Sequence, residues 1–425
     1  MDRREYPNIG ETLYSAVLPN GLRLNVVPKA GFSTRYAAFA ANYGGAHRRF
    51  RLDGDIIDSP AGVAHFLEHK MFDLPNGDNA LNILSANGAD PNAFTSSGMT
   101  CYYFSCTQGF EENLRMLLHF VSTPYFTAET VSKEQGIIGQ EIRMGEDSPD
   151  SRVYYNLMES LYRCHPVRDR VAGSLESIAR ISHETLYACH RAFYAPSNMA
   201  LCVEGDVDAE AIERIALEVL GSEPAPVPQV DFGPEESPFP CVKLRREVME
   251  VSAPLFLIGA KLSVEKSGEA AMRQRLVARL ALRILCGASS SFYSRLYAQG
   301  ILNRNFDYDL DFSAGTGTLI LGGESPRPEQ VLRELEQEVE QVRLHGLDES
   351  AFLRAKRSTL GSTLRALEDF ENVCVSLASG LFDGYCAFDS MPVLGSISLR
   401  ECESFLTENL GPERLALSII ESKAV

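Results

Sequence analysis

The pattern of apolar positions changes repeatedly between the two-residue period of a strand and the 3.6-residue period of a helix. In the first half, strands are predicted at 21–27, 36–41, 100–106 and 199–203, and helices at 111–121, 131–143, 153–163 and 183–192. Another helix is predicted to begin near Pro60, since proline is favoured in the first turn of a helix. This half is therefore predicted to be a sheet packed with helices.

The same series recurs in the second half. It comprises a pair of strands within 243–262, a helix at 270–286, a strand at 317–322, and helices at 329–342 and from Glu349. Between the halves, residues 222–240 are rich in proline and acidic residues and have no apolar period, which predicts an exposed linker. We therefore expect an α+β protein with two similar lobes, residues 1–221 and 241–425.

Composition and charge narrow the class of protein. A chain of 425 residues is too long for one ordinary core, which agrees with two domains. The net charge of −17 argues against binding to nucleic acid or to anionic membranes. No apolar run is long enough to insert into a membrane, and the first residues do not resemble a signal peptide, so a cytoplasmic location is expected. The ten cysteines contain no C-x-x-C pair and are expected to be thiols in a reducing compartment.

Candidate chemistry begins with the sequence H-F-L-E-H at 65–69, in the helix predicted near Pro60. At about 100° per residue, His65 and His69 lie one turn apart on one face, with Glu68 beside them. Two neutral imidazoles at this spacing can chelate one ion, and a carboxylate beside them can reach a water held by that ion. Zinc suits this donor set and brings no redox chemistry. The motif also occurs in unrelated helices as a pair of surface histidines, so it does not by itself establish a peptidase.

A catalytic zinc needs a third protein ligand, and the predicted helix at 131–143 offers two candidates. Glu134 and Glu141 are seven residues apart and lie on one face, two turns from each other. One of them can ligate the metal, and the other can accept the second N–H of a ligating histidine. The spacing alone leaves open which glutamate has which role.

Further segments carry a resemblance to a known family. They are 62–72 around the metal motif, 92–95 (N-A-F-T), 102–104, 165–166, 194–199 and 205–208. With these segments the chain resembles, over essentially its whole length, the inverted-zincin peptidases of family M16, which include pitrilysin, insulin-degrading enzyme and the mitochondrial processing peptidase.

The resemblance implies one zinc ion per chain and peptide substrates. It assigns His65, His69 and Glu141 as zinc ligands, Glu68 as the general base, and Glu134 as the group that supports the ligands. It also implies residues that bind substrate, which are Asn92, Ala93 and Phe94.

The resemblance further implies that this chain is half of a four-lobe clamshell, with a mixed, largely antiparallel sheet in each lobe. The second lobe has no metal set, because Ala355 aligns with Glu134 and Ser362 with Glu141. Residues 296–303 also contain no Arg and Tyr seven residues apart, a pair that family members often use to hold substrate. A partner subunit can supply this pair, so the prediction is a heterodimer with a related chain, with a homodimer as the alternative.

The predicted function is a cytoplasmic zinc endopeptidase that cleaves peptides or unfolded segments inside a closing chamber. Two alternatives stay open on the sequence alone. The chain can be a peptide-binding or scaffold subunit that does not cleave, or it can be a peptidase that removes the leader of a modified peptide.

Overall fold

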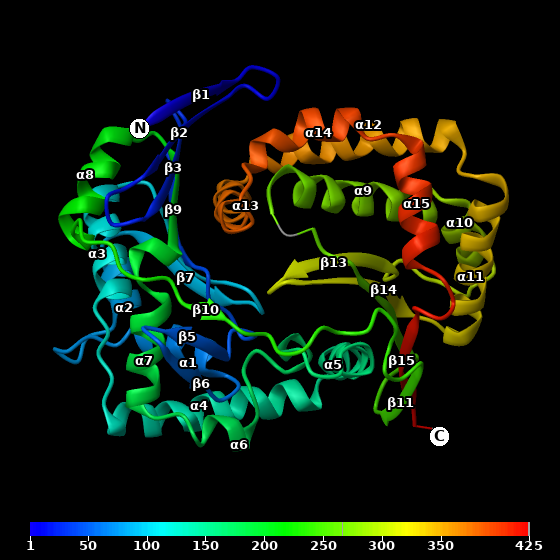
Figure 1. Cartoon of the computed structure of the whole chain (residues 1–425), viewed down its shortest axis with the longest axis horizontal. Helices are drawn as coiled ribbons and strands as arrows, with labels where there is room; N and C mark the ends of the chain where they lie inside the picture. Colours follow the sequence, from blue (N-terminus) through cyan, green and yellow to red (C-terminus); the bar gives the residue numbers. More distant parts are fainter. Residues whose placement is uncertain (266, 424–425) are drawn as a thin grey trace. The chain divides into compact units, whose positions relative to one another are not determined.

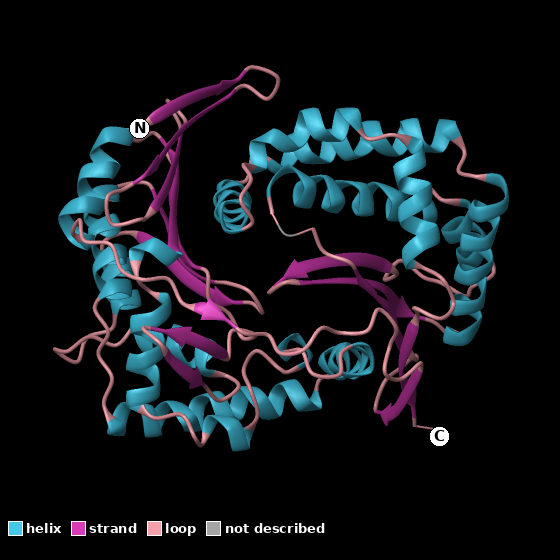
Figure 2. Cartoon of the chain, in the orientation of Figure 1, coloured by secondary structure: helices cyan, strands magenta, loops and turns pink. Residues whose placement is uncertain are grey.

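The computed structural model describes residues 1–265 and 267–423 and contains two compact units that interleave along the chain (Figures 1 and 2). Unit 1 comprises Met1–Ile142, Arg170–Phe232 and Leu364–Phe388, and unit 2 comprises Arg143–Asp169, Gly233–Thr363 and Asp389–Val425. Each unit holds a sheet packed with helices, which confirms the predicted α+β class with two lobes. The two units are defined by which residues are in contact, whereas the predicted lobes are continuous segments separated by residues 222–240. These predicted lobe boundaries therefore stay a prediction.

Unit 1 is built on a seven-stranded sheet with the order β1-β2-β3-β9-β4-β8-β7. Its strands are β1 (Asp2–Tyr6), β2 (Glu11–Val17), β3 (Arg23–Pro28), β4 (Arg35–Ala41), β7 (Ala89–Thr95), β8 (Thr100–Cys106) and β9 (Met199–Gly205). Along β9, Met199, Leu201 and Val203 face one hydrophobic cluster, while Ala200 and Cys202 face another. Because both faces are covered, the central strands β4 and β9 are mostly apolar and do not alternate regularly with polar residues.

Helices cover both faces of this sheet. They are α1 (Val63–Met71), α2 (Ala80–Ala86), α3 (Phe110–Ser122), the first part of α4 (Ala128–Asp147), α6 (Leu175–Ile178), α7 (His183–Phe193), α8 (Ala209–Leu220) and α13 (Phe370–Phe382). A small three-stranded sheet, β10-β5-β6, joins β5 (Arg49–Leu52), β6 (Asp55–Asp58) and β10 (Gln229–Val230). Short 3-10 turns lie at Pro166–Arg168, Pro196–Asn198 and Ala387–Asp389.

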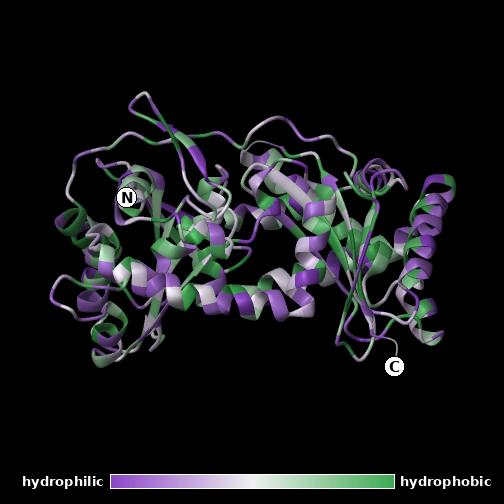
Figure 3. Ribbon diagram, turned by 90° about the horizontal axis from the view of Figure 1, so that it is seen from below, coloured by the Kyte–Doolittle hydropathy of each residue, from purple (hydrophilic) through white to green (hydrophobic). Residues whose placement is uncertain are grey.

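Unit 2 is built on a five-stranded sheet with the order β11-β15-β12-β14-β13. Its strands are β11 (Leu244–Met249), β12 (Leu255–Leu262), β13 (Asp307–Ser313), β14 (Thr316–Glu324) and β15 (Ala416–Ser422). Its helices include α5 (Pro149–Leu161), α9 (Gly268–Cys286), α10 (Ser291–Ala298), α11 (Pro328–His345), α12 (Glu349–Ala366), α14 (Ser390–Ser396) and α15 (Leu399–Asn409). Most helices of the chain carry both hydrophilic and hydrophobic residues (Figure 3), as expected where a helix buries one face.

The two sheets share one pairing scheme. In unit 1 the strands β3-β9-β4-β8-β7 form one parallel pair followed by three antiparallel pairs. In unit 2 the strands β11-β15-β12-β14-β13 form the same series. The corresponding strands also follow one another in the same order along the chain, so the predicted internal repeat is confirmed.

One helix in each half packs on the sheet of the other half's unit. α5 belongs to the first half of the chain, yet its Leu157 and Leu161 lie in a hydrophobic cluster with Ile320 and Ala416 of unit 2. α13 belongs to the second half, yet its residues Val373, Cys374, Leu377 and Ala378 lie in a cluster with β4 and β9 of unit 1. The two repeats thus exchange helices, because α13 packs on β4 and β9 and α5 packs on the corresponding strands β12 and β15.

Three expectations are corrected. The helix predicted near Pro60 begins at Val63, because Gly62 has a left-handed conformation (φ 97°) that interrupts the chain before it. The segment 222–240 is not wholly an exposed linker, since Val230 pairs with Phe50 in the small sheet. The two strands within 243–262 are not paired with each other, because β15 lies between β11 and β12. Among the described residues, every helix is too short or too polar to span a lipid bilayer.

Candidate metal centre

The helix α1 carries the H-x-x-E-H motif and is held by a close approach at its start. An added Cβ at Gly62 would lie 2.7 Å from the carbonyl oxygen of Ala172, and the positive φ also disfavours any other residue. Beyond this turn the helix buries an apolar face that includes Phe66 and Leu67. The opposite face carries His65, Glu68 and His69, as the helical period requires.

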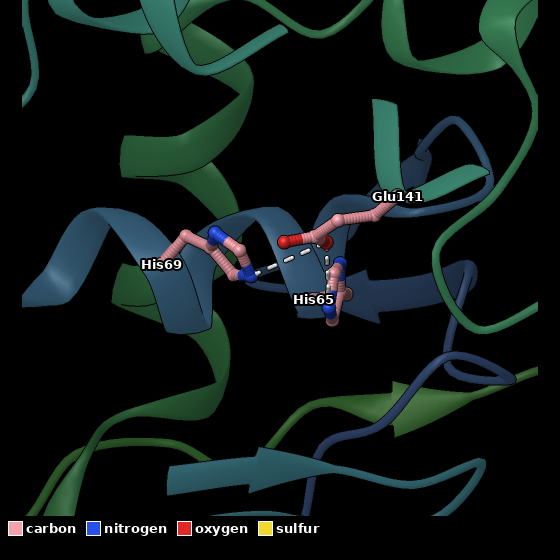
Figure 4. Close-up of side chains that lie close together, drawn as sticks. All are labelled: His65, His69 and Glu141. Atoms are coloured by element: carbon pink, nitrogen blue, oxygen red, sulfur yellow. Dashed lines mark ion pairs between the residues drawn. The ribbon is translucent and has the colours of Figure 1, made fainter. Parts of the chain in front are cut away.

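His65 and His69 meet Glu141 of α4, as Figure 4 shows. The Nε2 atoms of His65 and His69 lie 3.8 and 3.7 Å from Oε2 of Glu141. One potential ligand atom from each residue lies within 4.8 Å of the others, and no second group of this kind occurs among the described residues. Two imidazole nitrogens and one carboxylate oxygen form a donor set that zinc accepts in catalytic sites, so these residues fit the ion.

Glu134 contacts His69 at the ring nitrogen that does not face Glu141. Its Oε1 is 3.0 Å from Nδ1 of His69, and its Oε2 is 3.8 Å from Nζ of Lys70, which is only 1% exposed and also contacts Asp73. With Nδ1 bound to Glu134, Nε2 of His69 is the nitrogen directed at Glu141. Glu134 is therefore the orienting carboxylate and Glu141 the one beside both histidines, a distinction that helical spacing left open.

The two histidines have different electrostatic environments. Burial, reinforced by the neighbouring His69, lowers the pKa of His65 to about 4, which keeps its ring neutral and able to bind a metal at neutral pH. Burial also lowers the pKa of His69, but the hydrogen bond to Glu134 and the nearby carboxylates outweigh it and raise that pKa overall. Nδ1 of His65 is buried and has no hydrogen-bond partner among the described residues.

Glu68 forms a hydrogen bond with the sheet and is not one of the three candidate ligands, His65, His69 and Glu141. Oγ1 of Thr95, the last residue of β7, donates a 2.6 Å hydrogen bond to Oε2 of Glu68. Burial raises the pKa of Glu68, and the bond from Thr95 partly opposes this shift. The buried hydroxyls of Tyr102 and Tyr194 lie 2.9 Å apart. Burial raises the pKa of both hydroxyls, and the charge of Glu68 raises it further. The site thus holds a carboxylate of elevated proton affinity beside the metal-ligand set.

The predicted substrate residues lie on β7, which is one of the two edge strands of the seven-stranded sheet. Asn92 is exposed, and its Oδ1 accepts a 2.9 Å hydrogen bond from the backbone N–H of Ala93. Phe94 is half-buried near the ring of Tyr103. Since β7 ends at Thr95, the residues predicted to contact substrate and the hydrogen bond to Glu68 belong to one strand.

Sequence reasoning gave no role to Lys70 and Thr95. Both lie inside segments that carried the family resemblance, but their contacts depend on α4 and α1 respectively, which are distant in sequence. In the second half, Ala355 is buried within α12 and the Ser362 hydroxyl donates to the Ser358 carbonyl oxygen. These two positions therefore offer no carboxylate, in agreement with the alignment of the repeats.

Comparison with known proteins gives a consistent result. Residues 54–174 match the family described as insulinase (peptidase family M16), and residues 180–359 match the peptidase M16 inactive domain. A Bacillus subtilis protein described as an uncharacterized zinc protease, YmfH, is 36% identical and the match covers 99% of both chains. A Streptomyces coelicolor protein with the same description, SCO5738, is 27% identical, and the match covers 84% of this chain and 78% of that protein.

Solved structures extend the comparison. An M16-like peptidase from Alicyclobacillus acidocaldarius has a TM-score of 0.94 and 32% identity, with 99% of this chain and all of that chain covered. The periplasmic protease PqqL of Escherichia coli has a TM-score of 0.72 and 18% identity, and this chain covers 48% of its length. At that identity the likeness concerns the fold alone.

Proposed function

The chain belongs to peptidase family M16, and from this premise we propose that it is a zinc-dependent endopeptidase acting on peptides or unfolded segments. Relatives described as zinc proteases support a peptidase function in general. The proposal of a zinc-dependent endopeptidase rests on one observation, which is that His65 and His69 lie close to Glu141, beside a half-buried Glu68.

In this proposal His65, His69 and Glu141 hold the ion. When bound there, a zinc ion would supply Lewis acidity to the scissile carbonyl and would lower the pKa of water. Glu68 takes a proton from the attacking water and returns it to the leaving amine, a role suited to a carboxyl whose pKa burial raises. Thr95 fixes one carboxylate oxygen of Glu68, and Glu134 fixes the ring of His69.

The proposed substrate is an extended peptide that adds to the free edge of β7. Backbone hydrogen bonds supply affinity in this mode of recognition, and side-chain contacts add preference. Asn92 must release the N–H of Ala93 for a peptide carbonyl to accept it. Because Thr95 ends the same strand and binds Glu68, a peptide paired with β7 runs toward the proposed base.

The proposal includes a partner subunit that completes the chamber, either a related chain or a second copy. It also places the protein in the cytoplasm, where free thiols are the norm. All ten cysteines are free in the structure, which supports a reducing compartment.

The proposal is tested first by the metal content of the purified chain. Elemental analysis is expected to find one zinc ion per chain, and His65→Ala is expected to lose it because a three-ligand site then has two ligands. His183→Ala is the matched control, since His183 lies at the start of α7 and pairs with the adjacent Glu184. Full zinc content in His65→Ala would contradict the proposed ligand set.

A second candidate function is a peptide-binding subunit without hydrolytic activity. The match of residues 180–359 to a domain described as inactive favours it. A fluorogenic peptide library, tested with the zinc-loaded chain alone and with a co-expressed related chain, separates the two candidates. Hydrolysis that depends on Glu68 supports the peptidase, and saturable peptide binding without hydrolysis in either preparation supports the second candidate.

A further inference from the structure

β11 occupies the place in its sheet that β3 occupies in unit 1, but its outer side is open. Both strands lie parallel to the last strand of their repeat, β15 or β9. In unit 1 the other side of β3 is covered by β2, which in turn pairs with β1. Among the described residues, β11 pairs with β15 alone and forms the edge of the five-stranded sheet (Figure 1). The second repeat therefore has an open position where the first has a strand.

The outward backbone groups of β11 follow from its ladder with β15. The N–H of Leu417 donates to the carbonyl of Lys243, and the N–H of Lys423 donates to the carbonyl of Met249. In a parallel ladder alternate residues bond to the neighbouring strand, so the odd-numbered residues of β11 face β15. The N–H and C=O groups of Leu244, Arg246 and Val248 therefore point away from the sheet.

Two of the three residues whose backbone groups point outward also carry exposed apolar side chains. Leu244 is 44% exposed and Val248 is 54% exposed, and both lie on the face opposite α5. The other face is occupied, since Arg245 pairs with Glu159 and Glu247 with Arg152, both on α5. An open edge with apolar side chains is a template for strand pairing.

We propose that β11 pairs antiparallel with β11 of a second copy of this chain, which joins the two five-stranded sheets into one. A two-fold axis perpendicular to the sheet keeps each residue on its own face, so paired residues must both be even or both be odd in number. Centring the axis on Arg246 satisfies this condition. It also makes every outward N–H and C=O of Leu244, Arg246 and Val248 part of a hydrogen-bonded pair.

Side chains favour this register and a second copy as the occupant. Leu244 then lies opposite Val248 of the other copy, which buries the exposed apolar pair, and Arg245 lies opposite Glu247. A shift that centres the axis on Glu247 places Leu244 opposite Glu250 and Arg246 opposite Val248, which loses both matches. The register centred on Arg246 is therefore more complementary than the one centred on Glu247.

The charge of Arg246 is the main argument against pairing, because native edges are often protected by charged residues. In this chain the guanidinium of Arg246 contacts both Glu329 and Glu421. Two carboxylates accompany each arginine, so the symmetry axis does not bring two unneutralised cations together. The charge of Arg246 is therefore neutralised within its own unit. The outward N–H and C=O groups of β11 stay available for pairing.

This inference does not rest on the proposed peptidase function, since none of the metal-binding residues takes part. Analytical ultracentrifugation of the full-length chain is expected to show a dimer at micromolar concentration. Val248→Pro removes one outward N–H per copy, and two hydrogen bonds per dimer, without touching the ladder to β15. It is expected to weaken dimerisation ~10-fold or more.

Leu310→Pro is the matched control, on the opposite edge strand β13 of the same sheet. Its N–H bonds to the side chain of Asp309, so the same substitution there removes no bond to β14. We expect this variant to dimerise normally. A monomeric native chain, or equal dimerisation of native and Val248→Pro chains, would overturn the proposal. Circular dichroism of both variants verifies that the fold is retained.

The register is tested by crosslinking. In a chain with the exposed Cys164 and Cys241 changed to Ser, Leu244→Cys with Val248→Cys is expected to give a disulfide-linked dimer on oxidation. Opposed residues in such a pair have Cα atoms about 5.5 Å apart, within disulfide range. Leu244→Cys with Met249→Cys places the two thiols on opposite faces and is expected to crosslink poorly. Equal crosslinking of the two double variants would contradict the register.

Discussion

The two repeats have the same ladder and carry different side chains on it. The strands pair in the same order and directions, since β3 runs parallel to β9 in unit 1 as β11 runs parallel to β15 in unit 2. β3 is a buried interior strand, while β11 is half exposed along its length. The pairing scheme is thus maintained by backbone hydrogen bonds and apolar packing, and strand composition follows from which neighbours cover it.

The same comparison applies to the metal centre. α1 follows β4 and carries two histidines and a glutamate, whereas α9 follows the corresponding strand β12 and contains no histidine. α4 brings Glu134 and Glu141, and α12 has Ala355 and Ser362 in the aligned positions. Because unit 2 folds without these groups, the donor set in unit 1 is not required by the fold and is instead available for chemistry.

The sharpest test of this difference is Glu68→Gln. It is expected to reduce peptide hydrolysis by ~10³-fold or more, because the amide cannot accept a proton, while the zinc content stays at one per chain. Glu269→Gln, at the exposed start of α9, is the control from the other repeat and is expected to leave the rate unchanged. Near-normal turnover in Glu68→Gln would remove Glu68 from the mechanism.

The exchanged helices are expected to contribute equally to stability. Leu157 of α5 and Leu377 of α13 are both fully buried, and each packs on the corresponding sheet. Truncation of either to Ala is expected to cost ~2–5 kcal/mol, through lost burial and the cavity left behind. Urea unfolding followed by circular dichroism measures both midpoints, with the 44% exposed Leu353→Ala as control. A large effect for one helix alone would contradict the reciprocal exchange.

Glu204 on β9 and Glu421 on β15 lie on corresponding strands in different surroundings. Burial raises the pKa of Glu204 to about 8, against the opposing charge of Lys29 nearby. The folded protein thus retains a proton that the unfolded chain releases above about pH 4.5, so stability is lost as pH rises from there toward 8. Glu204→Gln is expected to remove this loss, which amounts to ~1 kcal/mol per pH unit.

Thermal unfolding at pH 5 and pH 8 measures the effect. Glu204→Gln is expected to be more stable than the native chain at pH 8 and similar to it at pH 5. Glu421→Gln is the control, because Glu421 is 37% exposed and paired with Arg246. An equal gain from both substitutions would show that burial of Glu204 is not the cause.

The smallest expected effect concerns Thr95. Thr95→Val removes the hydrogen bond to Glu68 and is expected to lower kcat ~10-fold with little change in KM, since the carboxylate is less well oriented. Ser313→Ala, the last residue of the corresponding strand β13, is the control. Zinc analysis checks that the metal is retained. A change confined to KM would assign Thr95 to substrate binding instead.

Much of the architecture could be predicted from local patterns. The strands at 100–106 and 199–203 and the helix at 111–121 are confirmed, because a buried strand or an amphipathic helix is recorded in the period of its apolar residues. Strands β1 and β2 and helix α13 were not predicted. β1 is largely exposed, and the role of α13 depends on a sheet formed by residues more than 160 positions earlier.

The sequence by itself determined that His65, Glu68 and His69 share one helical face, because helical geometry places residues three and four apart together. It also determined that the two halves repeat, because the apolar periods of strands and helices recur in the same order in both halves. Only the tertiary structure decided that Glu141 meets both histidines while Glu134 binds one, that Thr95 holds Glu68, and that β11 is left at an edge. These facts depend on which distant elements become neighbours, and no local period records that information.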